Sequence, residues 1–400
     1  MKRARIEKAG LLAVAGAVAV LGGLLGAAAV SAGGTVAVGV PARAGAVDGT
    51  TQSSDAFLWQ LFTQFAAPVS PMRPSRVVFE TWASDEDTFS QTPHWPGVDE
   101  PKRLHASLLG RMTDPALPSH GPIDVVCAPP GNAAVGGFPT QGPPTPCIAE
   151  ETKRNRPQYD YIVGHGLNTK AGLAAAFAKG FQVVMPASSI SVKGDWVPVQ
   201  TMLQWLPQLG SVGNVEKLYY TASSGGVEYA LVSLHVSSRQ NPNWVWGTFE
   251  HAMNPGRCDS MGCWDSFGST IPVVLPILSA VNTQYGACPK TPALQAWMKQ
   301  ANLSPVWQNY CLKSSQVDYN AADGTPTVLG NSVIERIVGN GTISASSCIG
   351  CHVYASFGAD GATPAAARAM LPYNPTGTPI PAVLKGATQF DFMWGVLLAP

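Results

Sequence analysis

The sequence has 400 residues, of which 25 are basic and 25 acidic, so its formal net charge at pH 7 is zero. This balance excludes a nucleic-acid-binding protein that relies on bulk positive charge. Hydrophobic residues make up 46% of the chain and charged residues only 12%, which favours a folded chain with a sizeable core over a disordered one. The 41 glycines and 34 prolines predict many loops and few long helices.

The N-terminus has the pattern of an export signal. The first eight residues, MKRARIEK, carry five charges, and residues 9–42 carry none. Because Ala42-Arg43-Ala44 offers a small-x-small cleavage site, we predict a signal peptide over 1–44 and a periplasmic or secreted mature chain. An uncleaved signal that anchors the chain is the alternative, because the apolar stretch exceeds the roughly 20 residues that a membrane span needs. We expect no stable membrane span after cleavage.

Residues 45–286 are predicted to form a mainly β, loop-rich domain. Its first element is a helix over 55–65, in which five apolar side chains share one face. Residues 93–157, which are rich in Pro and Gly, are predicted to be a long loop region, and 170–178 a helix. Segments rich in Val, Tyr and Trp between turn residues predict strands at 76–82, 181–185, 190–197, 217–221, 227–236 and 243–250.

Residues 287–400 are predicted to form a smaller helical domain. Thr291-Pro292 is a cap followed by proline, which predicts a helix that continues to residue 301. A second helix is predicted over 331–338, and a third begins near Ser344. Together the two domains give an α+β fold class.

The third helix carries the motif Cys348-Ile349-Gly350-Cys351-His352, a C-x-x-C-H sequence. This is the attachment motif of c-type haem, in which two thiols bind one edge of the porphyrin and the adjacent histidine binds the iron. In this motif the chain resembles secreted mono-haem c-type cytochromes. We therefore predict one covalent haem c on Cys348 and Cys351, with His352 as the proximal iron ligand.

Other functions of a C-x-x-C sequence fit less well. A structural zinc site needs four soft ligands, and the chain has no second C-x-x-C. A thioredoxin-like redox motif needs a βαβ context, which the predicted elements do not provide. Attachment of haem outside the cytoplasm also agrees with the export signal.

Six cysteines remain outside the motif, an even number that predicts disulfides in an exported chain. Sequence cannot fix their connectivity, so we take the simplest pairing, between neighbours. This pairing joins Cys127 to Cys147, Cys258 to Cys263, and Cys288 to Cys311.

The sixth position of the iron is left open by the sequence. Only 48 residues follow His352, and they contain Met370 and Met393. Met393 lies in an aromatic, apolar segment and is a possible distal ligand, although core packing is the alternative for both methionines. His251, at the end of a predicted strand, is another possible distal ligand, whereas we expect His235 to be a core histidine.

A wider resemblance rests on the segments FETWASDEDTF, SISVKGDW, NWVWGTFEHAMNPGRCD and SSCIGCH. Together they are similar to a group of uncharacterised bacterial exported proteins described as cytochrome-c-like. The resemblance implies haem and export, and it implies no substrate and no active-site residues.

Two functions follow from a single haem. The first is electron transfer through the iron bound by His352, with a redox partner protein that the sequence does not identify. The alternative is a haem-dependent oxidoreductase or peroxidase-like enzyme with a substrate pocket in the N-terminal unit. The size of that unit, far beyond a minimal cytochrome, is the argument for the alternative.

Overall fold

The computed structural model describes residues 53–70, 73–106, 148–259, 261–277, 283–333, 335, 346–371, 373 and 375–400. All of them belong to one unit of the chain, Val38–Pro400. The predicted signal peptide and the predicted Cys127–Cys147 disulfide lie outside the described residues. None of the helices in the described ranges combines the length and the apolar character that crossing a membrane requires.

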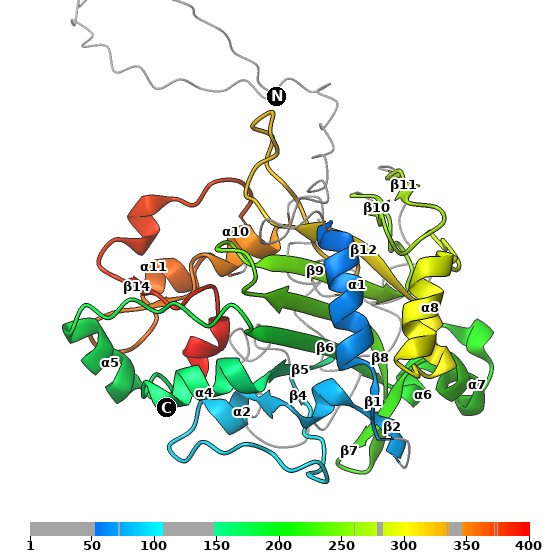
Figure 1. The fold of residues 1–400 in the computed structure, drawn as a ribbon, viewed down its shortest axis with the longest axis horizontal. Coiled ribbons are helices and arrows are strands. Elements are labelled where there is room, and N and C mark those ends of the chain that lie inside the picture. Colours follow the sequence, from blue (N-terminus) through cyan, green and yellow to red (C-terminus); the bar gives the residue numbers. More distant parts are fainter. Residues whose placement is uncertain are drawn as a thin grey trace, which may run out of the picture. The chain divides into compact units, whose positions relative to one another are not determined.

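An eight-stranded antiparallel sheet occupies the centre of the described structure (Figure 1). Its strand order is β12-β9-β8-β6-β5-β3, with β4 paired to β5 and β7 paired to β8. The strands are β3 (Ala83–Ser84), β4 (His105–Ala106), β5 (Ala149–Arg154), β6 (Ile190–Pro198), β7 (Thr221–Ser224), β8 (Val227–Ser238), β9 (Val245–His251) and β12 (Tyr310–Gln316).

Helices lie around this sheet and in the C-terminal part of the chain. The α-helices are α1 (Ser54–Phe65), α2 (Asp85–Thr88), α4 (Arg156–Gly164), α5 (Lys170–Ala178), α6 (Val199–Trp205), α7 (Val212–Leu218), α8 (Pro292–Gln300), α10 (Cys348–His352) and α11 (Ala365–Arg368). The 3-10 helices are η1 (Val78–Thr81), η3 (Pro207–Leu209), η4 (Pro305–Asn309), η6 (Pro381–Leu384) and η7 (Trp394–Leu398). Three small ribbons pair β1 (Pro68–Ser70) with β2 (Arg73–Val77), β10 (Cys263–Trp264) with β11 (Val273–Val274), and β13 (Ser356–Phe357) with β14 (Thr388–Gln389).

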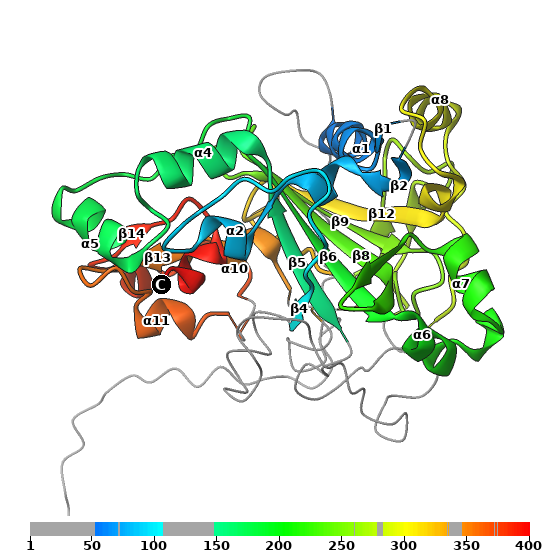
Figure 2. The same ribbon diagram turned by 90° about the horizontal axis from the view of Figure 1, so that it is seen from below.

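The two faces of the sheet differ in chemistry because successive residues of a strand point to opposite sides. On one face Val192, Leu234, Val236 and Phe249 join a core with side chains of α1 and α8. Figure 2 shows these two helices together on one side of the sheet and α10 away from them. The other face is polar, and its members include Ser191, Lys193, Asp195, Ser233, His235 and Ser237. The register places Lys193 opposite His235 and Asp195 opposite Ser233.

The α+β class is confirmed, as are several elements. The predicted helices over 55–65, 170–178 and 291–301 correspond to α1, α5 and α8. The predicted strands over 190–197, 227–236 and 243–250 correspond to β6, β8 and β9. The Cys258–Cys263 and Cys288–Cys311 disulfides are both present. Of the helix predicted over 331–338, the residues 334 and 336–338 lie outside the described part.

Four predicted segments were wrong. The strand predicted over 76–82 is the end of β2 followed by η1, whose Glu80 side chain accepts a hydrogen bond from the Val77 backbone. Residues 181–185 form no strand, and the Met185 amide donates instead to the Asp391 carboxylate. Residues 217 and 218 belong to α7, so β7 begins only at Thr221. The predicted loop region 93–157 contains β4, β5 and the beginning of α4.

The sheet also contains a strand from the C-terminal part of the chain. Strand β12 pairs with β9, and the register places Tyr310 opposite His251. The boundary predicted between residues 286 and 287 therefore does not coincide with an edge of the sheet.

A buried ion pair joins these two strands. The Lys313 ammonium lies 3.3 Å from the Glu250 carboxylate, and both side chains are almost fully buried. The same carboxylate accepts hydrogen bonds from the backbone amide and the hydroxyl of Ser332. The pair thus connects the sheet to the segment that precedes α10.

We predict that Lys313→Met lowers the free energy of unfolding by about 3–5 kcal/mol, because the Glu250 carboxylate stays buried after losing that ammonium. Urea denaturation followed by circular dichroism measures the change. The matched control is Lys299→Met, an exposed lysine of α8, for which we expect a change within about 0.5 kcal/mol. Equal stability of the two variants would contradict the prediction.

Candidate functional site

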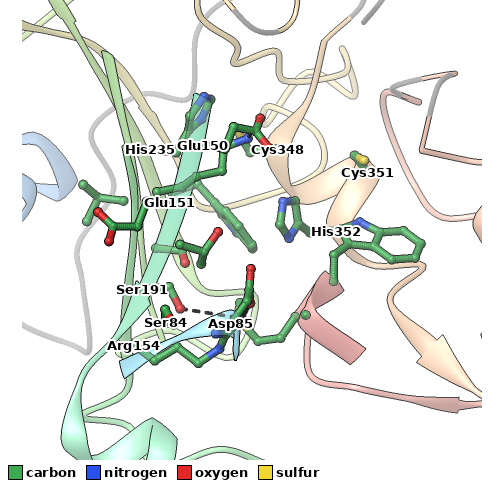
Figure 3. A pocket seen from close by; sticks show the side chains of 18 of the residues that line it. Ser84, Asp85, Glu150, Glu151, Arg154, Ser191, His235, Cys348, Cys351 and His352 are labelled. Carbon is green, nitrogen blue, oxygen red and sulfur yellow. Dashed lines mark hydrogen bonds and ion pairs between the residues drawn. The ribbon is translucent and has the colours of Figure 1, made fainter. Parts of the chain in front are cut away.

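A cavity lies between the polar face of the sheet and the C-terminal part of the chain (Figure 3). The space not filled by protein atoms is about 1430 Å³, including the part open to solvent. The sheet contributes Glu150, Glu151, Thr152, Arg154, Ser191, Lys193, His235, Val236, Ser237, Trp246 and Gly247 to its lining. The remaining lining residues are Ser84, which ends β3 of the sheet, and, outside the sheet, Asp85, Glu86, Glu335, Cys348, Cys351, His352, Leu371, Met393, Trp394 and Gly395.

Helix α10 places all three functional residues of the C-x-x-C-H motif at this cavity. Cys348, Cys351 and His352 all line it, and neither cysteine forms a disulfide. Figure 3 shows the His352 ring extending from α10 toward the strands that carry Glu150 and His235. The motif therefore faces the polar side of the sheet across an open space.

The His352 ring is held by one backbone group. Its Nδ1 lies 2.7 Å from the Phe392 carbonyl oxygen, so Nδ1 donates this bond and Nε2 keeps its lone pair. Burial lowers the pKa of His352 to about 4, and the Phe392 carbonyl only partly offsets this. The imidazole is therefore neutral at pH 7. A neutral imidazole whose other nitrogen donates to a carbonyl is the usual arrangement of a metal-binding histidine.

The two thiols are protonated in the folded chain. Burial raises the pKa of Cys351 to about 12 and raises that of Cys348 well above its usual value. Catalytic redox cysteines have the opposite property, a lowered pKa that produces thiolate at neutral pH. The environment of Cys348 and Cys351 therefore does not favour thiol–disulfide chemistry.

The start of α10 is attached to the sheet through Gln316 at the end of β12. The Gln316 side chain accepts a hydrogen bond from the Ile349 amide at 3.0 Å and donates one to the Ser347 hydroxyl at 2.9 Å. Ser347 in turn caps the helix by accepting from the Gly350 amide at 3.0 Å. Gln316 also donates to the hydroxyl of Thr327. This network fixes where the helix begins, and with it the directions of the three motif side chains.

The opposite wall contains ionisable side chains, of which Glu150 and Arg154 are buried and Lys193 and His235 are partly exposed. The Lys193 ammonium lies 2.9 Å from the Glu150 carboxylate. The Arg154 guanidinium pairs with Asp85, and its Nε and Nη1 have no hydrogen-bond partner within the described ranges. His235 Nε2 lies 2.6 Å from the Asn331 side-chain amide. Glu150 and Arg154 come from β5, Lys193 from β6 and His235 from β8, three strands that the register places side by side.

The structure separates the residues that the sequence suggested as a sixth iron ligand. Met393 lines the cavity, where its sulfur accepts a hydrogen bond from Ser191 at 3.5 Å. Met370 does not line it and packs instead beside the buried cluster around Val353 and Tyr354.

His251 does not line the cavity either, which corrects the expectation that it enters a cleft near the haem. Its Nε2 lies 3.0 Å from the Leu218 carbonyl oxygen, and its Nδ1 accepts from the Met253 amide at 3.2 Å. The ring stacks on Tyr219 with 3.6 Å between centroids. Both nitrogens are occupied, so His251 serves packing at the end of β9.

Sequence reasoning missed most of the sheet wall. His235, which we expected to be a core residue, lines the cavity, as do Glu150, Arg154 and Lys193. The signal was present as alternation of polar residues, in Ser191-x-Lys193-x-Asp195 and again in the Ser-x-His-x-Ser run of 233–237. A strand with alternating polar residues has a polar face, which a cavity or solvent must accommodate.

One further group of side chains has metal-ligand geometry. Ligand atoms of Asp87, His94 and Glu100 lie within 4.8 Å of one another, and no other such group occurs in the described segments. Cys348 and Cys351 are not members of it, so no described site of three such ligands involves the motif cysteines.

No protein-family model, curated protein or solved structure matches this chain.

We predict that Gly350→Ala displaces α10. A methyl group at this position would lie 2.1 Å from the Pro375 carbonyl oxygen, so the helix or its neighbour has to move. Such overpacking costs about 1–3 kcal/mol, and thermal unfolding measures the loss. The control is Gly213→Ala in α7, where nothing lies within 4 Å of the added carbon. We expect the control to retain or slightly raise stability, and a similar loss in both variants would refute the argument.

Proposed function

We propose that the protein is an exported c-type cytochrome that carries one haem, bound covalently through Cys348 and Cys351, with His352 as the proximal iron ligand. One observation carries the proposal. Two thiols without a disulfide and one oriented, neutral imidazole line the same cavity. All three are on the short helix α10, where Cys351 and His352 follow Cys348 by three and four residues. When bound, the haem would supply one-electron chemistry between Fe(III) and Fe(II).

The chain's own residues have defined roles in this proposal. Cys348 and Cys351 would form thioethers to the porphyrin edge, and the Phe392 carbonyl orients His352 and raises its basicity toward the iron. Gln316 and Ser347 fix the start of the helix that carries all three. Met393 remains the proposed protein ligand for the sixth position, because it lines the cavity.

Export is supported by the N-terminal pattern and by the disulfides. The Cys258–Cys263 and Cys288–Cys311 bonds would persist in an oxidising compartment and are rare in the cytoplasm. Covalent attachment would keep the haem bound in such a compartment. The redox partner is proposed to be a one-electron donor or acceptor protein outside the cytoplasm.

A second candidate function, a haem-dependent oxidoreductase, is favoured by the sheet wall. Lys193 and His235 line the same cavity as His352, and their charges add to the larger effect of burial in lowering the pKa of His352. A pure electron carrier needs no wall of ionisable side chains, whereas ionisable groups with shifted pKa values in a pocket are typical of active sites.

Absorption spectra with cyanide or carbon monoxide separate the two functions. An electron carrier with Met393 on the iron is expected to give low-spin spectra that ignore both added ligands. An oxidoreductase is expected to give high-spin spectra that shift on addition. If the wild-type spectrum ignores both ligands, Met393→Leu should give a spectrum that shifts when cyanide or carbon monoxide is added. A Met393→Leu spectrum that still ignores them would exclude Met393 as the sixth ligand.

We predict that Cys348→Ser and Cys351→Ser each lose one thioether and most of the haem-loaded protein in a host that can mature cytochromes c. The pyridine haemochrome spectrum and the intact mass measure this loss. The control is the double variant Cys258→Ser/Cys263→Ser, which removes a disulfide away from the cavity. We expect it to keep the haem. Colourless wild-type protein with an unmodified mass would overturn the proposed function.

A further inference from the structure

Asp195 is a buried carboxyl group with few partners. Its side chain is fully buried on β6, and its Oδ1 has no hydrogen-bond partner in the described part of the chain. The other oxygen, Oδ2, accepts from the Ser233 hydroxyl and from the Asn331 side-chain amide at 3.4 Å. Among the described residues, the one basic side chain within 4.0 Å of it is His235, at 3.7 Å. A carboxyl group in such a place is expected to hold its proton.

His235 connects this carboxyl group to the cavity. Asp195 itself does not line the cavity, whereas His235 does. The Asn331 amide lies 2.6 Å from His235 Nε2 and 3.4 Å from Asp195 Oδ2, so it bridges the two side chains. His235 Nε2 itself lies 3.7 Å from Asp195 Oδ2, so the cavity-lining His235 is the group through which a proton would reach the buried carboxyl group.

The neighbouring charges come from each element that packs against the pair. They are Glu150 on β5, Lys193 on β6, Glu250 on β9, Lys313 on β12, and Glu335. Burial raises the pKa of Asp195 to about 8, against the opposing effect of Lys193. Burial also lowers the pKa of His235 to about 3. At neutral pH the carboxyl group is therefore protonated and the His235 imidazole is neutral.

We propose that Asp195 and His235 form a proton site that makes reduction of the haem in this cavity take up a proton. This inference rests on the proposed function. With haem bound, one electron from the partner protein would reduce the iron from Fe(III) to Fe(II). One proton from solvent, passed by way of His235, would at the same time convert the Asp195 carboxylate to the acid. The physical cause is Coulomb's law: reduction removes one positive charge from the cavity and so increases the proton affinity of a nearby buried carboxylate.

The coupling has a measurable sign. In the pH range in which Asp195 is deprotonated in the oxidised protein and protonated in the reduced protein, the midpoint potential of the haem falls as pH rises. With one proton taken up per electron, each tenfold change in proton concentration corresponds to 59 mV. We expect the fall in the wild-type holoprotein once the pH passes the pKa of Asp195.

The test is a spectroelectrochemical titration of the holoprotein from about pH 6 to about pH 10. We expect Asp195→Asn to remove the fall in potential, because an amide does not titrate. The matched control is Asp160→Asn on α4, an exposed aspartate paired with Arg156, which should keep the wild-type fall. A pH-independent wild-type potential, or an unchanged fall in Asp195→Asn, would overturn the inference.

A second variant keeps the test decisive if Asp195→Asn does not fold. Ser233→Ala retains the carboxyl group but removes a hydrogen bond that favours its charged form. We expect the fall in potential to begin at a higher pH in this variant. A fall that begins at the wild-type pH would count against Asp195 as the proton site.

Failure of the proposed function is distinguishable from failure of this inference. Protein without haem overturns both, whereas haem-loaded protein with a pH-independent potential overturns only the proton site.

The pH dependence of the stability of the full chain, as purified, is an independent measure of the Asp195 pKa. Because the folded pKa of Asp195 is raised, its contribution to the free energy of unfolding is lost as pH rises from about 4 to about 8. The same pH dependence of unfolding in Asp195→Asn would overturn the inference.

Discussion

The attachment of α10 to the end of β12 by Gln316 is the interaction on which the candidate site depends. One side chain accepts from the first turn of the helix and donates to its cap, so the motif is fixed relative to the sheet. The helix spans only Cys348–His352, and so short a helix has little stability of its own. Its position is therefore set by the sheet, and the sheet wall and the motif belong to one site.

The polar face of the sheet is the second constraint. Apolar side chains on the other face pack against α1 and α8, and this packing supplies the core that holds the strands. The polar face stabilises the fold less than the apolar face does, because a charged group that leaves water loses hydration that its ion-pair partner only partly replaces. Lys193, Glu150 and His235 therefore lower the stability of the fold relative to apolar residues at the same positions. Their presence on this wall favours a chemical role for the cavity.

Sequence patterns predicted the elements that have strong local signals. Helix α1 has an apolar stripe and a serine cap, α8 has a cap followed by proline, and β6, β8 and β9 have β-branched and aromatic runs. Strand β5 was missed because its sequence, AEETKR, is polar and follows a long Pro- and Gly-rich stretch. Such a segment becomes a strand through pairing with β6, a long-range contact that local propensity does not reveal.

For the site, the sequence by itself determined the chemistry of one wall: two thiols and an imidazole in a fixed short spacing, which a helix brings to one side. Only the tertiary structure decided what faces them. His251 was placed in a packed strand end, His235 and Met393 were placed at the cavity, and Asp195 was placed behind His235. The physical reason is that the spacing of a motif is local, whereas the pairing of distant strands depends on the register and packing of the whole sheet.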